Sequence, residues 1–504
     1  MKPRSFQGNA SGRSLYFFSR IPEKISFGGG GTEQGPPAKG FPLTEDRKNI
    51  RKTRGDRQGA RFWGLPLLSA FLFSSCAIAP SVPPLQPTIN SLVVANRMSL
   101  AADKISTQEA DYGAGNYLLY YLDRGLVGFY AGRYQDSIRS FEKAKQRFAE
   151  LYTTSLSKEG MTWLVNDNAA PYRGSDYEYV LVNVFQALNF LQLGDLNEAL
   201  VEARDLTSKY QVVEGLAQKV KRRHFEDNGF ARFFMGLILQ AVGGTENESE
   251  ALLFYKEART LYQQFYAGTY IPRILQENLL TLSQKFGDEE YPALRNEMRG
   301  AEAVAARTDL AQLIVIHLVG YSPLKVPEII PVPLDRELIT KITFPKFLRR
   351  FYSVRSARIT AENDRGWRTT SETELGADIE DLAIKDLNSR KAVVLAKAII
   401  RPALKYLIER KQKEDIEKRN GRLAAEGFGL LSNLYNLFSE QADLRSWQSL
   451  PAQLRVARLF LSPGHYKLSS EGLGEGGILV GVDNIGEVEL RSGETRFVII
   501  RSPR

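Results

Sequence analysis

The chain between residues 90 and 305 repeats one pattern of small and bulky positions. In two places a small residue on a first predicted helix, Gly125 or Ala187, precedes a small residue on a second predicted helix, Ser137 or Ala199, by 12 positions. Small residues let two helices approach closely, and a glycine between them ends the first helix. A third copy is looser. The predicted packing positions are Gly125, Ser137, Phe141, Ala187, Ala199, Gly236, Ala251 and Tyr255.

This spacing is typical of tetratricopeptide (TPR) repeats, whose helix pairs stack into a curved solenoid with a concave binding surface. We therefore predict a TPR-like helical domain over residues 90–305 that binds a protein or peptide. An irregular helical bundle without a groove remains the alternative, because the sequence contains only three divergent copies of the pattern.

The pattern changes from helical to strand-like in the second half of the chain. Runs rich in β-branched residues, such as 312–320 and 352–359, are bounded by Gly and Pro and predict strands. One apolar face predicts a long helical segment within 377–440, and short punctuated strands over 453–504 predict a small antiparallel sandwich. The predicted fold class is α+β, with the helical-repeat domain followed by a β-rich domain at 310–504 that carries the helical insertion and the C-terminal sandwich.

The net charge of +9 first suggests a nucleic-acid-binding protein, but its distribution argues against that class. Residues 1–75 contain 13 basic and 5 acidic residues, so eight of the nine net charges precede the single cysteine, Cys76. The remainder of the chain is almost neutral. We therefore expect no nucleic-acid partner.

The residues before Cys76 form the three parts of a secretory signal. A basic stretch is followed by the apolar run 62–73 and then by Ser74 and Ser75, directly before the cysteine. The apolar run is too short to span a bilayer. Because a cysteine follows the small residues, residues 46–75 resemble a bacterial lipoprotein signal peptide, which implies that Cys76 becomes the lipidated first residue of the mature protein.

The flanking segments complete this prediction. Residues 1–45 are rich in Gly and Pro and are interpreted as a disordered or spurious upstream segment. Residues 76–89 are rich in proline and are predicted to be a semi-rigid tether after the lipidated cysteine. Ala77 after the cysteine is compatible with sorting to an outer membrane, so we expect an exported, lipid-anchored protein that faces the periplasm.

A polar loop separates the first two repeats. Residues 164–178 have a density of Asn, Asp, Pro and Gly that cannot continue a helix. The loop either binds a partner or caps the flanking helices, which is the commoner use of Asn and Asp. The candidate partner-binding residues are Asn166, Asp167, Asn168, Pro171, Tyr172, Arg173 and Asp176.

These features lead to a family resemblance. The run 121–141, the loop 166–174, residues 187–204 and the stretch 445–451 together resemble an uncharacterised family of bacterial TPR-like envelope lipoproteins. The likeness extends over roughly positions 110–465. It implies an envelope protein without an established activity, associated with other envelope proteins and possible cell-wall synthesis machinery, and it transfers no catalytic residue.

The sequence contains no motif for a nucleophile, a metal site or a nucleotide, so we assign no catalytic residue, metal or cofactor. The three histidines share no metal-ligand spacing. Carboxylates leave no short motif, so an enzyme or activator acting on cell-wall glycan through the 166–178 loop is the alternative function. A weaker alternative is membrane-surface binding by a basic helix that contains Lys397, Arg401 and Lys405.

Overall fold

The structure is a computed structural model that describes residues 82–155, 170–219, 227–304, 309–333, 339–422, 426 and 442–503. Every described residue lies in one compact unit, residues 71–504. The predicted upstream segment, signal peptide and Cys76 lie outside the described residues, as do Asn166, Asp167 and Asn168. The described part is mixed α+β, as the sequence predicted.

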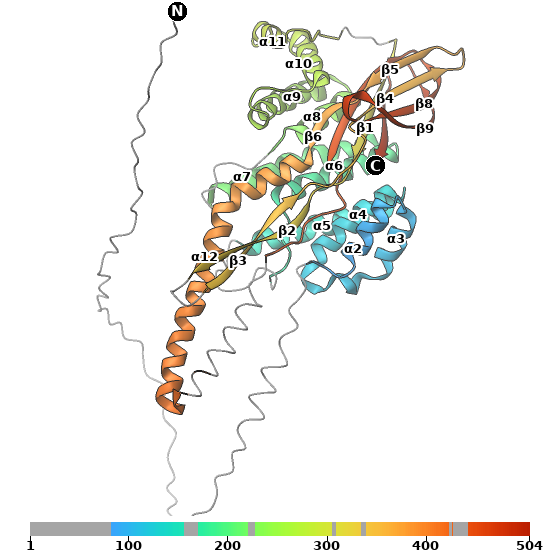
Figure 1. Cartoon of the computed structure of the whole chain (residues 1–504). Helices are drawn as coiled ribbons and strands as arrows, with labels where there is room; N and C mark the ends of the chain where they lie inside the picture. Colours follow the sequence, from blue (N-terminus) through green and yellow to red (C-terminus); the bar gives the residue numbers. More distant parts are fainter. Residues whose placement is uncertain are drawn as a thin grey trace, which may run out of the picture. The chain divides into compact units, whose positions relative to one another are not determined.

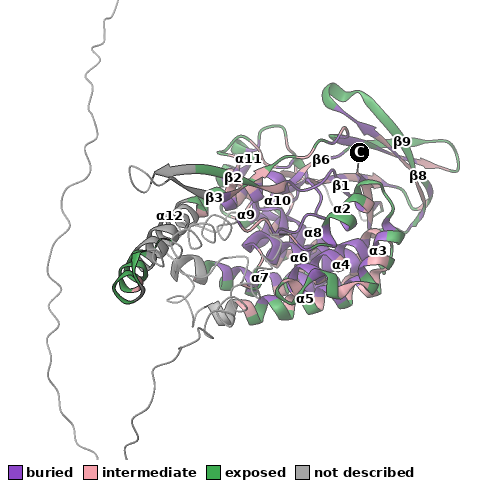
Figure 2. Cartoon of the chain, turned by 60° about the horizontal axis from the view of Figure 1, so that its bottom comes forward, coloured by how far each residue is buried: buried purple, intermediate pink, exposed green. Residues whose placement is uncertain are grey.

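The first half of the unit consists of helices that follow one another in space as they do in sequence (Figure 1). Buried residues concentrate along α4, α6 and α8, whereas α5 carries exposed residues along one side (Figure 2). The helices are α2 (Gln86–Val94), α3 (Met98–Thr107), α4 (Tyr117–Tyr130), α5 (Tyr134–Ser155), α6 (Asp176–Gln192), α7 (Leu196–Lys219), α8 (Phe230–Val242), α9 (Thr245–Phe265), α10 (Arg273–Lys285) and α11 (Tyr291–Glu297).

The first helix corrects the predicted tether. Residues 76–89 were expected to be an extended spacer, yet α2 begins at Gln86 and the side chain of Ile89 is completely buried. Pro87 lies in the first turn of this helix, where its missing N–H costs no hydrogen bond. Ile89 and Val93 are four residues apart and bury one face of α2. The proline content therefore marks the start of a helix as well as a spacer.

The predicted packing positions lie where consecutive helices contact each other. A Cβ atom at Gly125 of α4 would come within 2.5 Å of the Phe141 ring on α5, and one at Gly236 of α8 would collide with the Tyr255 ring on α9. Only a residue without a side chain leaves room for these rings. The predicted positions Ser137, Ala187, Ala199 and Ala251 are likewise completely buried.

The described residues of the second half form two four-stranded sheets and a separate two-stranded ribbon. The first sheet has the order β10-β1-β7-β6 and the second has the order β5-β4-β8-β9. The ribbon, β2 and β3, lies alongside the long helix α12 (Figure 1). The strands are β1 (Ala311–Val319), β2 (Leu324–Pro333), β3 (Ile339–Leu348), β4 (Ser356–Asn363), β5 (Arg368–Glu372), β6 (Glu374–Asp378), β7 (Gln453–Leu461), β8 (Gly464–Leu473), β9 (Leu479–Leu490) and β10 (Thr495–Ser502), and α12 is Ile379–Asn420.

Both faces of β1 are buried, which explains its unbroken apolar sequence. Leu313 and Val315 pack between the two four-stranded sheets, with residues of β4, β7 and β8. Ile314 and Ile316 point the other way and join the large hydrophobic cluster that includes the helices. The first sheet therefore lies between the second sheet and the helical half, and the two halves of the chain share one core.

This arrangement corrects the predicted sandwich. An antiparallel sandwich was expected from residues 453–504 alone, but the stacked sheets also use β1, β4, β5 and β6, and β10 pairs in parallel with β1. The last strand can run parallel because it joins the edge of a sheet whose central strand, β1, comes from much earlier in the chain. Alternating apolar residues predict that a strand is half-buried, but they do not identify its neighbour.

Candidate functional site

An irregular stretch of the second half is buried against the helical half. We call residues 442–452 the inserted segment, and it leads directly into β7. Every residue from Arg445 to Ala452 is buried, although the segment belongs to no helix or strand. The predicted binding helices therefore already contact a peptide segment, and that segment belongs to their own chain.

Trp447 is the apolar centre of this interface. Its side chain is 1% exposed, and its ring lies 5.9 Å from the rings of both Phe141 and Phe185 in edge-on geometry. Edge-on aromatic pairs of this kind add to the stabilisation that burial alone provides. Phe141 is one of the predicted packing positions, so the ring that fills the gap left by Gly125 also holds the inserted segment.

From Arg445 to Leu450 the backbone of the inserted segment is hydrogen-bonded mainly to side chains rather than to a neighbouring strand. Six consecutive carbonyl oxygens, from Arg445 to Leu450, each accept a hydrogen bond from elsewhere in the chain. A buried segment without a neighbouring strand must obtain its hydrogen-bond partners in this way. The donors, in order, are Lys325 Nζ, Gln86 Nε2, Ser322 Oγ, Arg350 Nη2, Tyr130 Oη and the Ser322 backbone N–H, at 2.5–3.2 Å.

Glu178 connects the predicted loop to the inserted segment. Its Oε1 accepts the backbone N–H of Trp447 at 2.9 Å. Its Oε2 accepts the Tyr172 hydroxyl at 2.6 Å and the Ser175 backbone N–H at 2.7 Å. Together with the Ser175 side chain, Glu178 forms a capping box at the start of α6. This carboxylate is fully buried, and both of its oxygens hold structure together.

The other described loop residues divide into an inner and an outer group. Asp176 is buried beside Arg390 of α12, which also donates to Ser175 Oγ at 3.1 Å. Burial opposes the charged form of Arg390, but the carboxylates of Asp386 and Asp176 raise its pKa above the usual value. Pro171 and Arg173 are exposed. The loop therefore faces the core through Tyr172 and Asp176 and faces solvent through Pro171 and Arg173.

Asp123 is a second buried carboxylate at the inserted segment. Its Oδ1 accepts the Ser449 hydroxyl at 2.6 Å, and its Oδ2 accepts hydrogen bonds from Tyr112 and Gln86, each at 2.9 Å. Burial raises the pKa of Asp123 to about 6, although these three donors favour the charged form. The sequence analysis did not select Asp123. The available signal was that it is the only acidic residue of helix α4 and lies among apolar and aromatic residues.

In addition to these buried carboxylates, the described residues offer no candidate metal centre. They contain no group of three or more His, Cys, Asp or Glu side chains that could hold a metal ion. His317 is buried between Thr373 and Ser502, and burial lowers its pKa to about 3, so it is neutral near pH 7. Among the helices within the described ranges, none is both long and apolar enough to cross a membrane.

A scan against protein-family models and searches of curated proteins and of solved structures find no match to this chain. The resemblance to TPR-like envelope lipoproteins therefore stays a prediction from the residues that carry it.

Proposed function

We propose that this protein is an exported lipoprotein, anchored through Cys76, that serves as an interaction scaffold in the bacterial cell envelope. The signal-like residues 46–75 and the single cysteine support the anchor. The interface around the inserted segment supports the scaffold, because its buried polar groups join the two halves of the chain. A scaffold needs such a rigid connection so that surfaces on the two halves keep a fixed relation.

The helix pairs α4/α5, α6/α7 and α8/α9 support a TPR-like interpretation of the first half. In the first and third pairs a glycine faces an aromatic ring of the second helix, as the repeat pattern requires. The helical face next to Phe141 and Phe185 is occupied by Trp447. A protein partner would therefore bind outward-facing residues, of which Pro171 and Arg173 belong to the predicted loop.

The contacts of Glu178 and Asp176 weigh against the alternative of a glycan-acting enzyme. A general acid or nucleophile must reach its substrate, and a pair of carboxylates must flank it. Glu178 is fully buried with three donors on its two oxygens, and Asp176 is 6% exposed. We therefore propose that the loop has a structural role, in which its buried side connects the two halves of the chain and its other side is exposed.

The anchor is tested by membrane fractionation of the full precursor and its Cys76→Ser variant. We expect the unchanged protein in the membrane fraction and the variant in the soluble fraction, and unchanged membrane fractionation of the variant would contradict the anchor. Mass spectrometry of the purified protein identifies the modified first residue. An unlipidated Cys76 in membrane-bound protein would overturn the anchor.

The scaffold is tested by placing a photoreactive amino acid at single positions and crosslinking in intact cells. We expect crosslinks to one recurrent envelope protein from position 173 and none from position 299, an exposed arginine on the α11 side of the helical half. Equal crosslinking from both positions would indicate nonspecific contact and contradict a binding role for the loop.

A further inference from the structure

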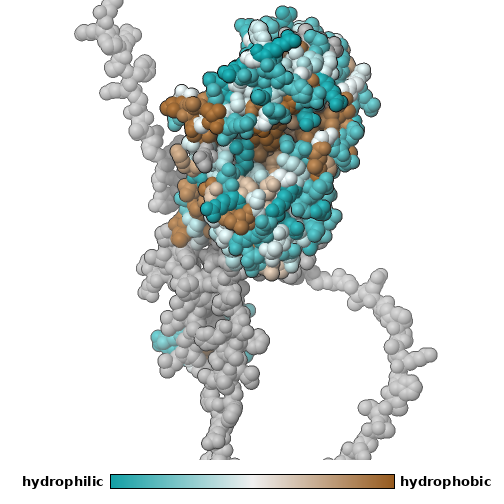
Figure 3. Space-filling model, turned by 90° about the vertical axis from the view of Figure 1, so that its right-hand side faces the viewer, coloured by the Kyte–Doolittle hydropathy of each residue, from teal (hydrophilic) through white to brown (hydrophobic). Residues whose placement is uncertain are grey.

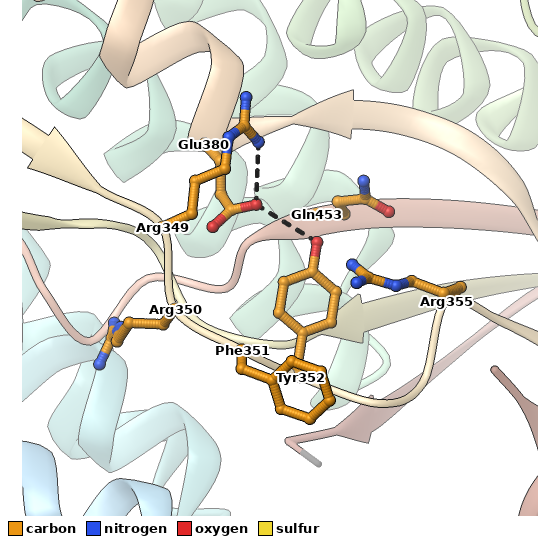
Figure 4. A pocket seen from close by; sticks show the side chains of 7 residues that line it. All are labelled: Arg349, Arg350, Phe351, Tyr352, Arg355, Glu380 and Gln453. Atoms are coloured by element: carbon orange, nitrogen blue, oxygen red, sulfur yellow. Dashed lines mark hydrogen bonds and ion pairs between the residues drawn. The ribbon is translucent and has the colours of Figure 1, made fainter. Parts of the chain in front are cut away.

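A surface cavity lies on the opposite side of Arg350 from the inserted segment. It has a volume of about 380 Å³ and is lined by residues from the stretch after β3, from the start of α12 and from the start of β7. Figure 4 shows the Tyr352 hydroxyl and the Arg349 guanidinium converging on Glu380, with Gln453 beside them and Arg355 reaching in from the opposite side. The Arg350 side chain points away from this group.

Arg349 and Arg355, two arginines that line the cavity, differ in their ion pairs. Arg349 forms ion pairs with Glu380, at 3.2 Å, and with Asp381. Arg355 is exposed and lies over the Tyr352 ring, with its guanidinium carbon 4.5 Å from the ring centre. Within the described ranges no carboxylate forms an ion pair with Arg355. Arg355 therefore contacts Tyr352 but has no anionic partner among these residues, and an oxyanion would match its guanidinium.

Exposed apolar side chains flank the same opening. Phe351 is 88% exposed and lines the cavity, and Ile478, in the loop near residues 353–355, is 71% exposed. The two segments are adjacent, because the Arg355 backbone N–H donates to the Leu473 carbonyl at 2.6 Å, and Leu473 is paired with Leu479 of β9. Leu479 and Val480 are also exposed. We call Phe351 and residues 478–480 the apolar rim.

Exposed apolar groups on this scale are usually covered by a partner or a lipid phase. Figure 3 shows hydrophobic patches separated by hydrophilic surface on one face of the molecule, so the surface is not uniformly apolar. A small soluble anion would satisfy Arg355 but would leave the apolar rim in water. An amphiphile satisfies both, because its oxyanion and its hydrocarbon are adjacent.

We propose that the cavity and its apolar rim bind an anionic lipid surface, with a headgroup phosphate at Arg355 and acyl chains against Phe351 and residues 478–480. This contact goes beyond the proposed anchor, because it uses the folded body rather than the lipid on Cys76. In an anchored protein it would fix the orientation of the scaffold on the membrane. Arginine forks bind phosphate with two hydrogen bonds, and exposed aromatic rings favour the interface.

The test is co-sedimentation with vesicles of phosphatidylcholine, with or without phosphatidylglycerol. Because residues 71–504 form their own compact unit, the protein comprises residues 76–504 with Cys76→Ser, so neither the leader nor an attached lipid contributes. We expect Arg355→Gln to weaken binding to the anionic vesicles roughly fivefold. Phe351→Ala should weaken binding to the same vesicles by about tenfold, because it removes most of one apolar side chain.

Matched controls change the same chemistry elsewhere. Arg358→Gln removes an exposed cation from β4, three residues further along the chain, and Leu253→Ala removes a 61% exposed apolar side chain from α9. Circular dichroism establishes that all variants are folded. If the cavity variants bind the anionic vesicles as well as the control variants do, the proposal is wrong.

A competition experiment separates a lipid surface from a soluble ligand. Glycerol 3-phosphate presents the same oxyanion without hydrocarbon, so we expect it to bind weakly and to leave vesicle binding unchanged at millimolar concentration. If instead it binds as tightly as the vesicles do, and Phe351→Ala has no effect, the cavity recognises a soluble phosphate and the lipid proposal is overturned. Because the tested protein carries no lipid, this outcome is independent of the Cys76 anchor.

Discussion

Arg349 and Arg350 are neighbours in the sequence and have opposite environments. Arg350 is half-buried, and its guanidinium donates to the carbonyls of Gln448 and Ser322 at 2.5 and 2.6 Å. Burial lowers the pKa of Arg350 to about 10. The side chain of Arg349 is 51% exposed and forms ion pairs at the rim of the cavity. The interface of the inserted segment thus contributes to stability, whereas the cavity keeps polar groups available to solvent.

The largest expected effect comes from the centre of the inserted segment. Trp447→Ala should lower the free energy of unfolding by about 3–5 kcal/mol, because it leaves a large cavity between Phe141 and Phe185. Urea unfolding followed by circular dichroism measures this change. The control is Trp367→Ala at a position that is 75% exposed, where the expected change is about 0.5 kcal/mol or less. Similar losses at both positions would contradict the central role of Trp447.

The next effect is a pH dependence at Asp123. Its pKa is raised from 3.8 to about 6, so the folded state binds this proton more tightly than the unfolded state does. The corresponding stability is fully present below about pH 4 and is lost as the pH rises through about 6, a loss of about 3 kcal/mol. Glu178 adds to the shift, since its negative charge also raises the pKa of Asp123.

Comparing Asp123→Asn with the unchanged protein isolates this contribution from other carboxylates. Between pH 4.5 and pH 7, the free energy of unfolding should fall less in the variant than in the unchanged protein. Asp136→Asn, at an exposed position, should leave the difference as it was. An identical pH dependence in all three proteins would show that Asp123 titrates at its ordinary pKa.

A smaller effect is expected at Arg350. Arg350→Gln leaves two buried carbonyl oxygens with poorer donors, so unfolding should become easier by about 2 kcal/mol. The denaturant midpoint measures the change. If Arg350→Gln leaves the denaturant midpoint unchanged, the inserted segment is held by its apolar contacts alone.

The smallest effect is expected at the neighbouring Arg349. Arg349→Gln removes half-exposed ion pairs, which contribute about 1 kcal/mol or less. High salt should reduce the stability of the unchanged protein toward that of the variant, because salt screens exposed charges. A loss as large as that of Arg350→Gln would remove the distinction between the two arginines.

The sequence predicted local features more successfully than contacts between distant segments. The pairing of Gly125 with Phe141 is within reach of a pattern search, because both residues lie on consecutive helices and the gap left by the glycine has to be filled. The strand β1 was predicted within a residue or so at each end from its β-branched run. The start of α2 was missed because proline was interpreted only as a spacer, although the first turn of a helix accepts it.

The candidate site was predicted only in part. Tyr172 and Asp176 were selected as partner-binding residues, and the structure places both against the chain's own segments. The stretch 445–451 was noted for its resemblance to a family, but its position against α4, α5 and α6 had no local signal. Hydrogen bonds such as Ser449 to Asp123 connect residues 326 positions apart, and no periodicity extends that far.

The sequence by itself determined most of the helical and strand-like segments, which small residues lie opposite aromatic rings, and that the positive charge precedes Cys76. These properties depend on neighbours within one or two helical turns, or on composition. Only the tertiary structure decided that the helical face is occupied by residues 442–452, that β10 runs parallel to β1, and that Arg349 and Arg350 differ. Burial and backbone hydrogen bonding set these choices, because an irregular segment must find an apolar surface and donors for its carbonyls wherever the folded chain provides them.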